Sequence, residues 1–109
     1  MTNREATIAL NMLPKIGPIK VRRLLELLGS SEAILRAPIN TLTRASGVGN
    51  ETAKIITQWE EYVDLTKELT EASQRKISII TEEDEDYPAS LRNMYDPPLA
   101  LYILSLIHI

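Results

Sequence analysis

The residues of this chain that could do chemistry are basic side chains beside glycines. The segment from residue 14 to residue 23 holds four cations and no acid: Lys15, Lys20, Arg22 and Arg23. A second glycine segment, Gly47-Val48-Gly49, is followed by Lys54. Glycine lets a backbone approach a ligand without a Cβ in the way, and the cations favour an anion such as phosphate. These two segments are the candidate functional site.

Other kinds of site have little support. The chain has no cysteine, and its one histidine, His108, lies next to the C-terminus, which argues against zinc binding and histidine catalysis. The acidic run Glu82–Asp86 could indicate a metal site, but such runs are usually solvated loops. We find no nucleotide-binding loop and no nucleophile–base pair. We therefore predict no enzyme activity, no metal and no cofactor.

The net charge of -3 is unevenly distributed. Residues 1–76 hold 11 basic and 9 acidic side chains, whereas residues 77–109 hold one arginine and six acids. Backbone recognition depends on the local field, so the overall charge does not exclude nucleic-acid binding. No run approaches the roughly 18 apolar residues of a membrane span, and no signal peptide is evident. We expect a cytoplasmic protein without a membrane partner.

The two glycine segments fit one template. Leu13-Pro14-Lys15-Ile16-Gly17 and Ala45-Ser46-Gly47-Val48-Gly49 each end in a glycine that opens an amphipathic stretch, and Gly17 and Gly49 are 32 residues apart. The matched pair resembles a tandem helix–hairpin–helix (SAM-like) arrangement. The amides after each glycine would be unpaired at a helix N-terminus, where phosphate is favoured. Such contacts set position rather than read sequence.

Within this template Ile16 and Val48 should plug into the core, and Lys20 and Lys54 could add charge-assisted contacts. The predicted DNA-binding residues are Lys15, Ile16, Gly17, Lys20, Arg22, Arg23, Gly47, Gly49, Thr52 and Lys54. Hairpins of this kind also serve as plain helix connectors or bind protein, and Glu51 weakens the second one. We expect Trp59 and Tyr62 to pack in the core or between domains rather than to stack on bases.

The elements that must position these residues are mainly helices. Thr2 and Glu5 form a capping box for a helix over 2–12, and a second helix should run from Pro18 to a C-cap at Gly29. Ser31 should cap a helix to Arg36, Asn40 a turn or two through Ala45, and Asn50 a further helix. That last pattern extends to Arg75, as one long helix or as two joined near residues 59–63.

The pattern changes after residue 76. A strand is expected over 77–81, a short helix over 89–94, and an apolar strand over 99–104 that suits a parallel sheet buried on both faces. The predicted organisation is a helical domain at 1–76, the first strands of an incomplete α/β (Rossmann-like) domain at 77–104, and a non-native tail at 105–109.

The order of motifs resembles the N-terminal third of the DNA-processing protein family DprA (Smf). The resemblance covers residues 5 to about 104 and rests on Asp86-Tyr87-Pro88, Leu91, Asp96-Pro97-Pro98 and Leu101-Tyr102 after the helical region. It implies a bacterial protein that binds single-stranded DNA in natural transformation and supports loading of a RecA-type recombinase. In that family the principal DNA site, the recombinase contact and the homodimer surface belong to a following Rossmann-like part, so the hairpins would be accessory.

Two other functions compete with this one. The helical region could be an interaction domain that contacts a partner, or the Rossmann-like portion, without DNA affinity of its own. It could also be the hairpin domain of a repair nuclease, ligase or helicase. The YP…DPP…LY string counts against that third function, because such proteins have no reason to carry it.

Overall fold

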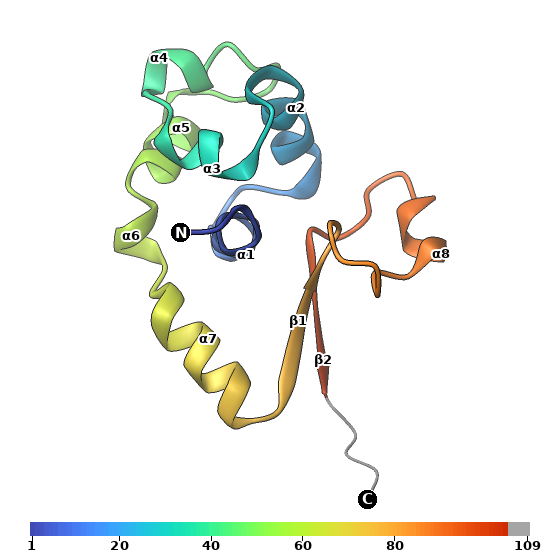
Figure 1. Cartoon of the computed structure of the whole chain (residues 1–109). Coiled ribbons are helices and arrows are strands. Elements are labelled where there is room, and N and C mark those ends of the chain that lie inside the picture. The colour runs from blue at the N-terminus through green and yellow to red at the C-terminus, as the bar shows by residue number, and fades with distance from the viewer. Residues whose placement is uncertain (105–109) are drawn as a thin grey trace, which may run out of the picture.

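The computed structural model describes residues 1–104, and the tail predicted at 105–109 lies outside the described residues. Helices and a two-stranded sheet follow one another along the chain (Figure 1). The elements are α1 (Asn3–Met12), α2 (Pro18–Leu28), α3 (Ser31–Arg36), α4 (Ile39–Leu42), α5 (Asn50–Thr57), α6 (Trp59–Tyr62), α7 (Leu65–Gln74), β1 (Ile77–Thr81), α8 (Ala89–Arg92) and β2 (Ala100–Leu104). No helix within the described range is long and apolar enough to cross a membrane.

The first two helices begin and end as the sequence predicts. Thr2 and Glu5 form the capping box of α1, with the Glu5 amide donating to the Thr2 hydroxyl oxygen. Pro18 opens α2, where its missing amide costs nothing. Gly29 ends α2 at a φ of 91°, the left-handed conformation that glycine adopts without steric cost.

Three predicted helix caps are wrong by one or two residues. Ser30, not Ser31, caps α3 by accepting a hydrogen bond from the Ala33 amide. The Ser31 hydroxyl is buried and pairs instead with Thr7. Asn40 lies inside α4, which starts after Pro38 and ends at Leu42 rather than Ala45. Gly49 takes the N-cap position of α5, so Asn50 is already helical.

The apolar pattern that runs to Arg75 forms three helices. A short step at Gln58 separates α5 from α6, and the extended backbone of Val63 separates α6 from α7. Asp64 then caps α7 by accepting a hydrogen bond from the Lys67 amide. The buried Val63 lies in the extended link, which is why the spacing of apolar residues looks continuous in sequence.

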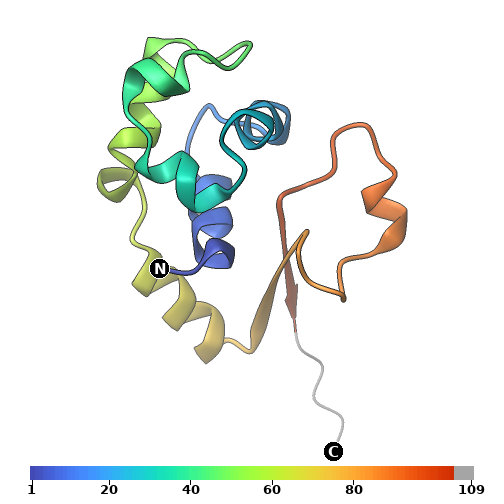
Figure 2. The same cartoon turned by 45° about the horizontal axis from the view of Figure 1, so that its top comes forward.

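One hydrophobic core holds α1 to α5 together. Its fully buried side chains include Leu10, Val21, Leu24, Ile34 and Ile56. α3 lies between the two hairpin-containing pairs and contacts α1, α2 and α5. Figure 2 shows α2 to α5 gathered at the top of the view, with α2 on the side of the β-strands. The core therefore sets the two hairpins in a fixed relation to each other.

The two strands are antiparallel, which contradicts the predicted parallel sheet. Ile77 pairs with Leu104 and Thr81 with Ala100. Only the start of β2 is buried, and Leu104 is 62% exposed, so the strand is not covered on both faces either. An uninterrupted apolar run does not encode the direction of its partner. The structure thus shows a small two-stranded sheet and gives no support for a Rossmann-like arrangement.

The sheet packs on the helical part rather than standing apart. Ile79 and Ala100 form a second apolar cluster with Ile8 of α1 and Ala72 of α7. The Tyr102 hydroxyl donates to the Glu68 carboxylate of α7 over 2.7 Å. Leu99 belongs to the main core itself. The domain boundary placed at residue 76 stays a prediction, and apolar contacts cross it.

Candidate nucleic-acid interface

The two predicted hairpins have matching backbones. Lys15 in the first and Gly47 in the second occupy the same template position and both have positive φ, 63° and 82°. The helix-opening glycines, Gly17 and Gly49, have nearly identical φ angles of -91° and -92° in extended backbone. The sequence template therefore corresponds to one turn conformation made twice.

Each hairpin is fixed by apolar side chains that point into the core. Ile16 and Val48 are 7% and 5% exposed and both belong to the main core, as predicted. Leu13 and Ala45, which begin the two turns, are buried as well. The side chain of Ile16 therefore holds the turn in place, and its predicted part in binding is confined to the backbone.

An arginine of α2 braces the second hairpin. Arg23 Nη1 donates to the Ser46 carbonyl oxygen over 3.2 Å. A Cβ added to Gly47 would lie only 2.7 Å from the same Nη1 atom. Gly47 thus has a structural reason to be glycine in its positive φ, and an added Cβ would also require the Arg23 guanidinium to shift.

Gly17 and Gly49 have no such internal reason. Their φ values suit any residue, and a Cβ added at either position would have nothing within 4 Å. Both occupy helix N-caps without a side-chain cap, where serine, threonine, asparagine or aspartate would stabilise the helix better. What the two glycines share is open space in front of a helix N-terminus.

The amides behind these glycines lack protein acceptors. The first backbone hydrogen bond of α2 runs from the Val21 amide to the Gly17 carbonyl oxygen. The first of α5 runs from the Ala53 amide to the Gly49 carbonyl oxygen. Within residues 1–104, the amides that precede them in each first turn donate to no other group: Ile19 and Lys20 in α2, and Asn50, Glu51 and Thr52 in α5. The Thr52 side chain is buried, so this residue offers its amide rather than its hydroxyl.

Charged side chains connect the two hairpins. Lys15 Nζ lies 2.8 Å from Glu51 Oε1 in the first turn of α5, and these side chains are 68% and 74% exposed. The hydrogen bond from Lys15 lowers the pKa of Glu51, and nearby Lys20 lowers it further. Lys54 is exposed on the same helix as Glu51. The Lys15–Glu51 pair shows that the two turns lie beside each other.

Arg22 points away from the hairpins. Its guanidinium pairs with the Glu82 carboxylate, at 3.1 Å between Nη1 and Oε2, and also donates to the Pro97 carbonyl oxygen. The hydrogen bond to Glu82 raises the pKa of Arg22. Residues 20 and 23 share one side of α2 while residue 22 lies on another, because a helix turns about 100° per residue. The patch predicted from four cations is therefore divided between two faces.

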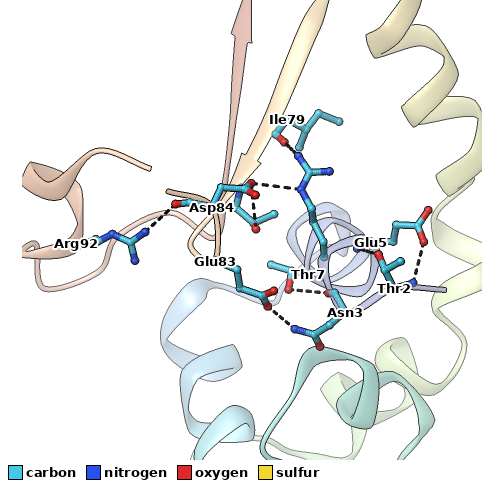
Figure 3. A network of polar contacts seen from close by, with 10 residues as sticks. Thr2, Asn3, Glu5, Thr7, Ile79, Glu83, Asp84 and Arg92 are labelled. Atoms are coloured by element: carbon cyan, nitrogen blue, oxygen red, sulfur yellow. Dashed lines mark hydrogen bonds and ion pairs between the residues drawn. The ribbon is translucent and has the colours of Figure 1, made fainter. Parts of the chain in front are cut away.

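The first three acids of the run Glu82–Asp86 have partners in the helical part or in β1, whereas Glu85 and Asp86 are exposed, as expected of a solvated loop. Asp84 Oδ2 accepts hydrogen bonds from the Thr81 amide, over 2.8 Å, and from Arg4 Nε, over 3.3 Å (Figure 3). Glu83 accepts a hydrogen bond from Asn3, and Arg4 also donates to the Ile79 carbonyl oxygen. No group of three or more acidic, histidine or cysteine side chains in the described part of the chain is arranged to hold a metal ion.

The two aromatic residues near the hairpins differ in burial. Trp59 is partly buried and packs against the main core, as expected. Tyr62 is 51% exposed, so the expectation that it packs in the core is wrong. α6 is a single turn, and its last residue points outward because Val63 takes the buried position.

Sequence reasoning missed the Glu51 and Ser46 contacts. In the sequence Glu51 is only an unfavourable charge beside the second hairpin, and nothing in the spacing predicts that it contacts Lys15, which lies 36 positions earlier. The Arg23–Ser46 contact joins residues 23 positions apart. The one available signal was the repeated template, since two equal hairpins on one core tend to lie close together.

A family model described as a SAM-like helix-hairpin-helix tandem matches residues 8–58. The matched stretch runs from α1 to just beyond α5 and contains both hairpins. Comparisons with curated proteins and with solved structures gave no match. Residues 8–58 are thus similar to a helix–hairpin–helix tandem, a type of domain that commonly binds nucleic acid.

Proposed function

We propose that the two hairpins together bind the sugar–phosphate backbone of nucleic acid without reading its sequence. The observation that carries this proposal is the pair of helix-opening glycines, Gly17 and Gly49, which neither φ nor packing requires. Their lack of a side chain leaves open space in front of a first turn of unpaired amides. A phosphate oxygen is the ligand that such a helix end favours.

The surrounding charges support the same ligand. Lys15 and Lys20 belong to the first hairpin and its helix, and Lys54 belongs to the helix after the second hairpin. Arg23 keeps the second turn in shape through Ser46. Contacts from two hairpins to neighbouring phosphates position a strand but carry no sequence information. In this proposal the role is binding without catalysis.

The finer proposal follows from the resemblance to DprA. The chain would act in the cytoplasm on single-stranded DNA, and its hairpins would assist a main DNA site in a Rossmann-like part. Contacts with a RecA-type recombinase and a possible homodimer partner belong to that part in the proposal. The order of motifs after residue 76 supports it, whereas the antiparallel pairing of β1 and β2 adds nothing in its favour.

The test is a binding titration of the full chain with labelled single-stranded and duplex DNA at two salt concentrations. We expect weak binding that is insensitive to sequence and falls steeply as salt rises. Replacing both Gly17 and Gly49 by alanine should lower the affinity while the thermal unfolding midpoint stays at the wild-type value, because a Cβ fits at both positions.

A matched pair of lysine variants controls for overall charge. Lys20→Gln should weaken binding and lower the salt dependence by about one counterion. Lys67→Gln removes the same charge from the exposed face of α7 and should leave binding nearly unchanged. Equal losses from both variants, or no binding by the wild-type chain at low salt, would contradict the proposal.

A second candidate function is that of an interaction domain, in which the helical part binds the C-terminal segment that includes residues 79–97. The contacts of Arg4 and Arg22 with residues 79–97 favour it, because two cations of the helical part are already committed there. If this is the main role, Arg22→Gln should release the segment while DNA binding stays absent in every variant. Proteolysis between residues 82 and 98 would report the release.

A further inference from the structure

We infer that Glu51 is an internal competitor for the phosphate that the two hairpins bind, an inference that rests on the proposed function. Glu51 belongs to the first turn of α5, and its carboxylate occupies the Lys15 amine that the proposed site would offer to a phosphate. The chain thus supplies its own anion to a site built for one.

The geometry of the pair supports this role. Glu51 Oε1 lies 2.8 Å from Lys15 Nζ, and Lys20 is close enough to lower the pKa of the same carboxylate. Glu51, on the helix that follows the second hairpin, therefore interacts with cations of the first hairpin and its helix. A phosphate that bridges the two hairpins would first have to break the Lys15–Glu51 ion pair.

Folding gives little reason for the pair. Both side chains are mostly exposed, and exposed ion pairs add little to stability. Lys15 also carries its charge at a φ of 63°, where glycine is the favoured residue and where the second hairpin has Gly47. A strained, exposed lysine paired with an exposed glutamate is costly as a fold-stabilising device. As a displaceable contact at a binding site, the same pair is reasonable.

Competition has a defined consequence for binding. Any ligand that engages Lys15 must replace the Glu51 carboxylate, so affinity is lower than the exposed amides and cations alone would give. A carboxylate that swings out on its flexible side chain leaves the amides of α5 available. The first hairpin is therefore regulated by a residue of the second, and the two act as one site.

The experiment compares Glu51→Gln with Glu85→Gln in the full chain, using labelled single-stranded DNA at low and moderate salt. Glu85 is an exposed acid of the 82–86 run and makes no ion pair among the described residues. We expect Glu51→Gln to bind about two- to fivefold more tightly than wild type, the range that an exposed ion pair can impose. Glu85→Gln should bind like wild type.

A double-variant cycle separates competition from simple repulsion. In a Lys15→Gly background the gain from Glu51→Gln should largely disappear, because there is no lysine left to release. A gain of the same size in both backgrounds, or an equal gain from Glu85→Gln, would overturn the inference. Wild-type binding with no gain from Glu51→Gln would overturn the inference alone, whereas no binding by any variant would overturn the proposed function as well.

Discussion

Lys15 and Gly47 adopt the same left-handed backbone at equivalent positions of the two hairpins, with φ of 63° and 82°. In the second hairpin the residue is glycine, which suits this φ without steric cost. In the first it is a lysine whose amine reaches across to Glu51. The same turn is thus made once with the residue that suits its conformation and once with a residue that adds charge.

Lys15→Gly should separate stability from binding. The variant removes the cost of a lysine at positive φ, so its thermal unfolding midpoint should equal or exceed that of wild type. It also removes a cation, so DNA affinity should fall and the salt dependence should drop by about one counterion. Calorimetry and titration on the same sample test both parts, and a lower midpoint would contradict the structural account.

Gly47→Ala should lower the unfolding free energy, whereas Gly17→Ala should leave it nearly unchanged. At Gly47 a Cβ meets the Arg23 guanidinium at a positive φ, so we expect a loss of about 1–2 kcal/mol in unfolding free energy. At Gly17 the added Cβ meets nothing, and stability should stay within about 0.5 kcal/mol of wild type. Urea unfolding measures both. Equal destabilisation of the two variants would show that the hairpin geometry is wrong.

Arg22→Gln should affect stability more than binding. The Arg22 side chain is 31% exposed and its guanidinium bridges Glu82 and Pro97, so its loss leaves the partly buried Glu82 carboxylate without its cation. We expect a cost of about 1–3 kcal/mol. DNA affinity should change less than in Lys20→Gln, whose side chain lies on the hairpin side. If Arg22→Gln lost more affinity than Lys20→Gln while its stability stayed unchanged, Arg22 would have to be part of the binding surface after all.

Asp84 should make stability depend on pH at the acid end. The hydrogen bond from the Thr81 amide lowers the pKa of Asp84, with a further contribution from Arg4. A lowered pKa stabilises the fold above the unfolded value of about 3.9, and this contribution is lost as pH falls through the folded pKa. Asp84→Asn should therefore be less stable than wild type by about 1–2 kcal/mol at pH 7.

Urea unfolding of this variant and wild type from pH 7 down to pH 2 measures the effect. The two curves should converge at the acid end, where Asp84 is protonated in wild type. Glu85→Gln, next to Asp84 but exposed, serves as the control and should follow wild type throughout. A difference that stays constant with pH would show that Asp84 does not act through its charge.

Truncation after residue 76 should lower stability even though both hairpins remain. Removing β1 and β2 uncovers Ile8, which is fully buried against Ile79 and Ala100, and takes Leu99 out of the main core. Exposing a buried isoleucine alone costs about 1.5–3 kcal/mol. Thermal unfolding of chains 1–76 and 1–104 makes the comparison. Equal midpoints would support the domain boundary predicted from composition.

Much of the local structure followed from the sequence because its causes are local. The capping box of Thr2 and Glu5, the proline that opens α2 and the glycine that ends it all act within one helical turn. The two hairpins were found for the same reason, since each is a five-residue turn with its own signature. The predicted cap position was wrong where neighbouring residues have similar capping propensity, as with Ser30 and Ser31.

The partners of charged side chains were not predictable in the same way. Arg22 looked like a member of a basic patch, and only the packing of α2 against the C-terminal segment gave it to Glu82. Lys15 belongs to the same predicted patch, and only the shared core brought Glu51 within its reach. An ion pair between distant residues depends on how helices pack, which local propensity does not encode.

The sequence by itself determined the two turns, their glycines and the helix N-termini behind them, because backbone sterics and capping act over a few residues. The tertiary structure alone decided that the strands run antiparallel, that the first three acids of the acidic run are anchored by Asn3, Arg4 and Arg22, and that Glu51 meets Lys15. These outcomes are set by contacts between residues that lie 19 to 80 positions apart, where burial of apolar surface rather than local preference chooses the neighbours.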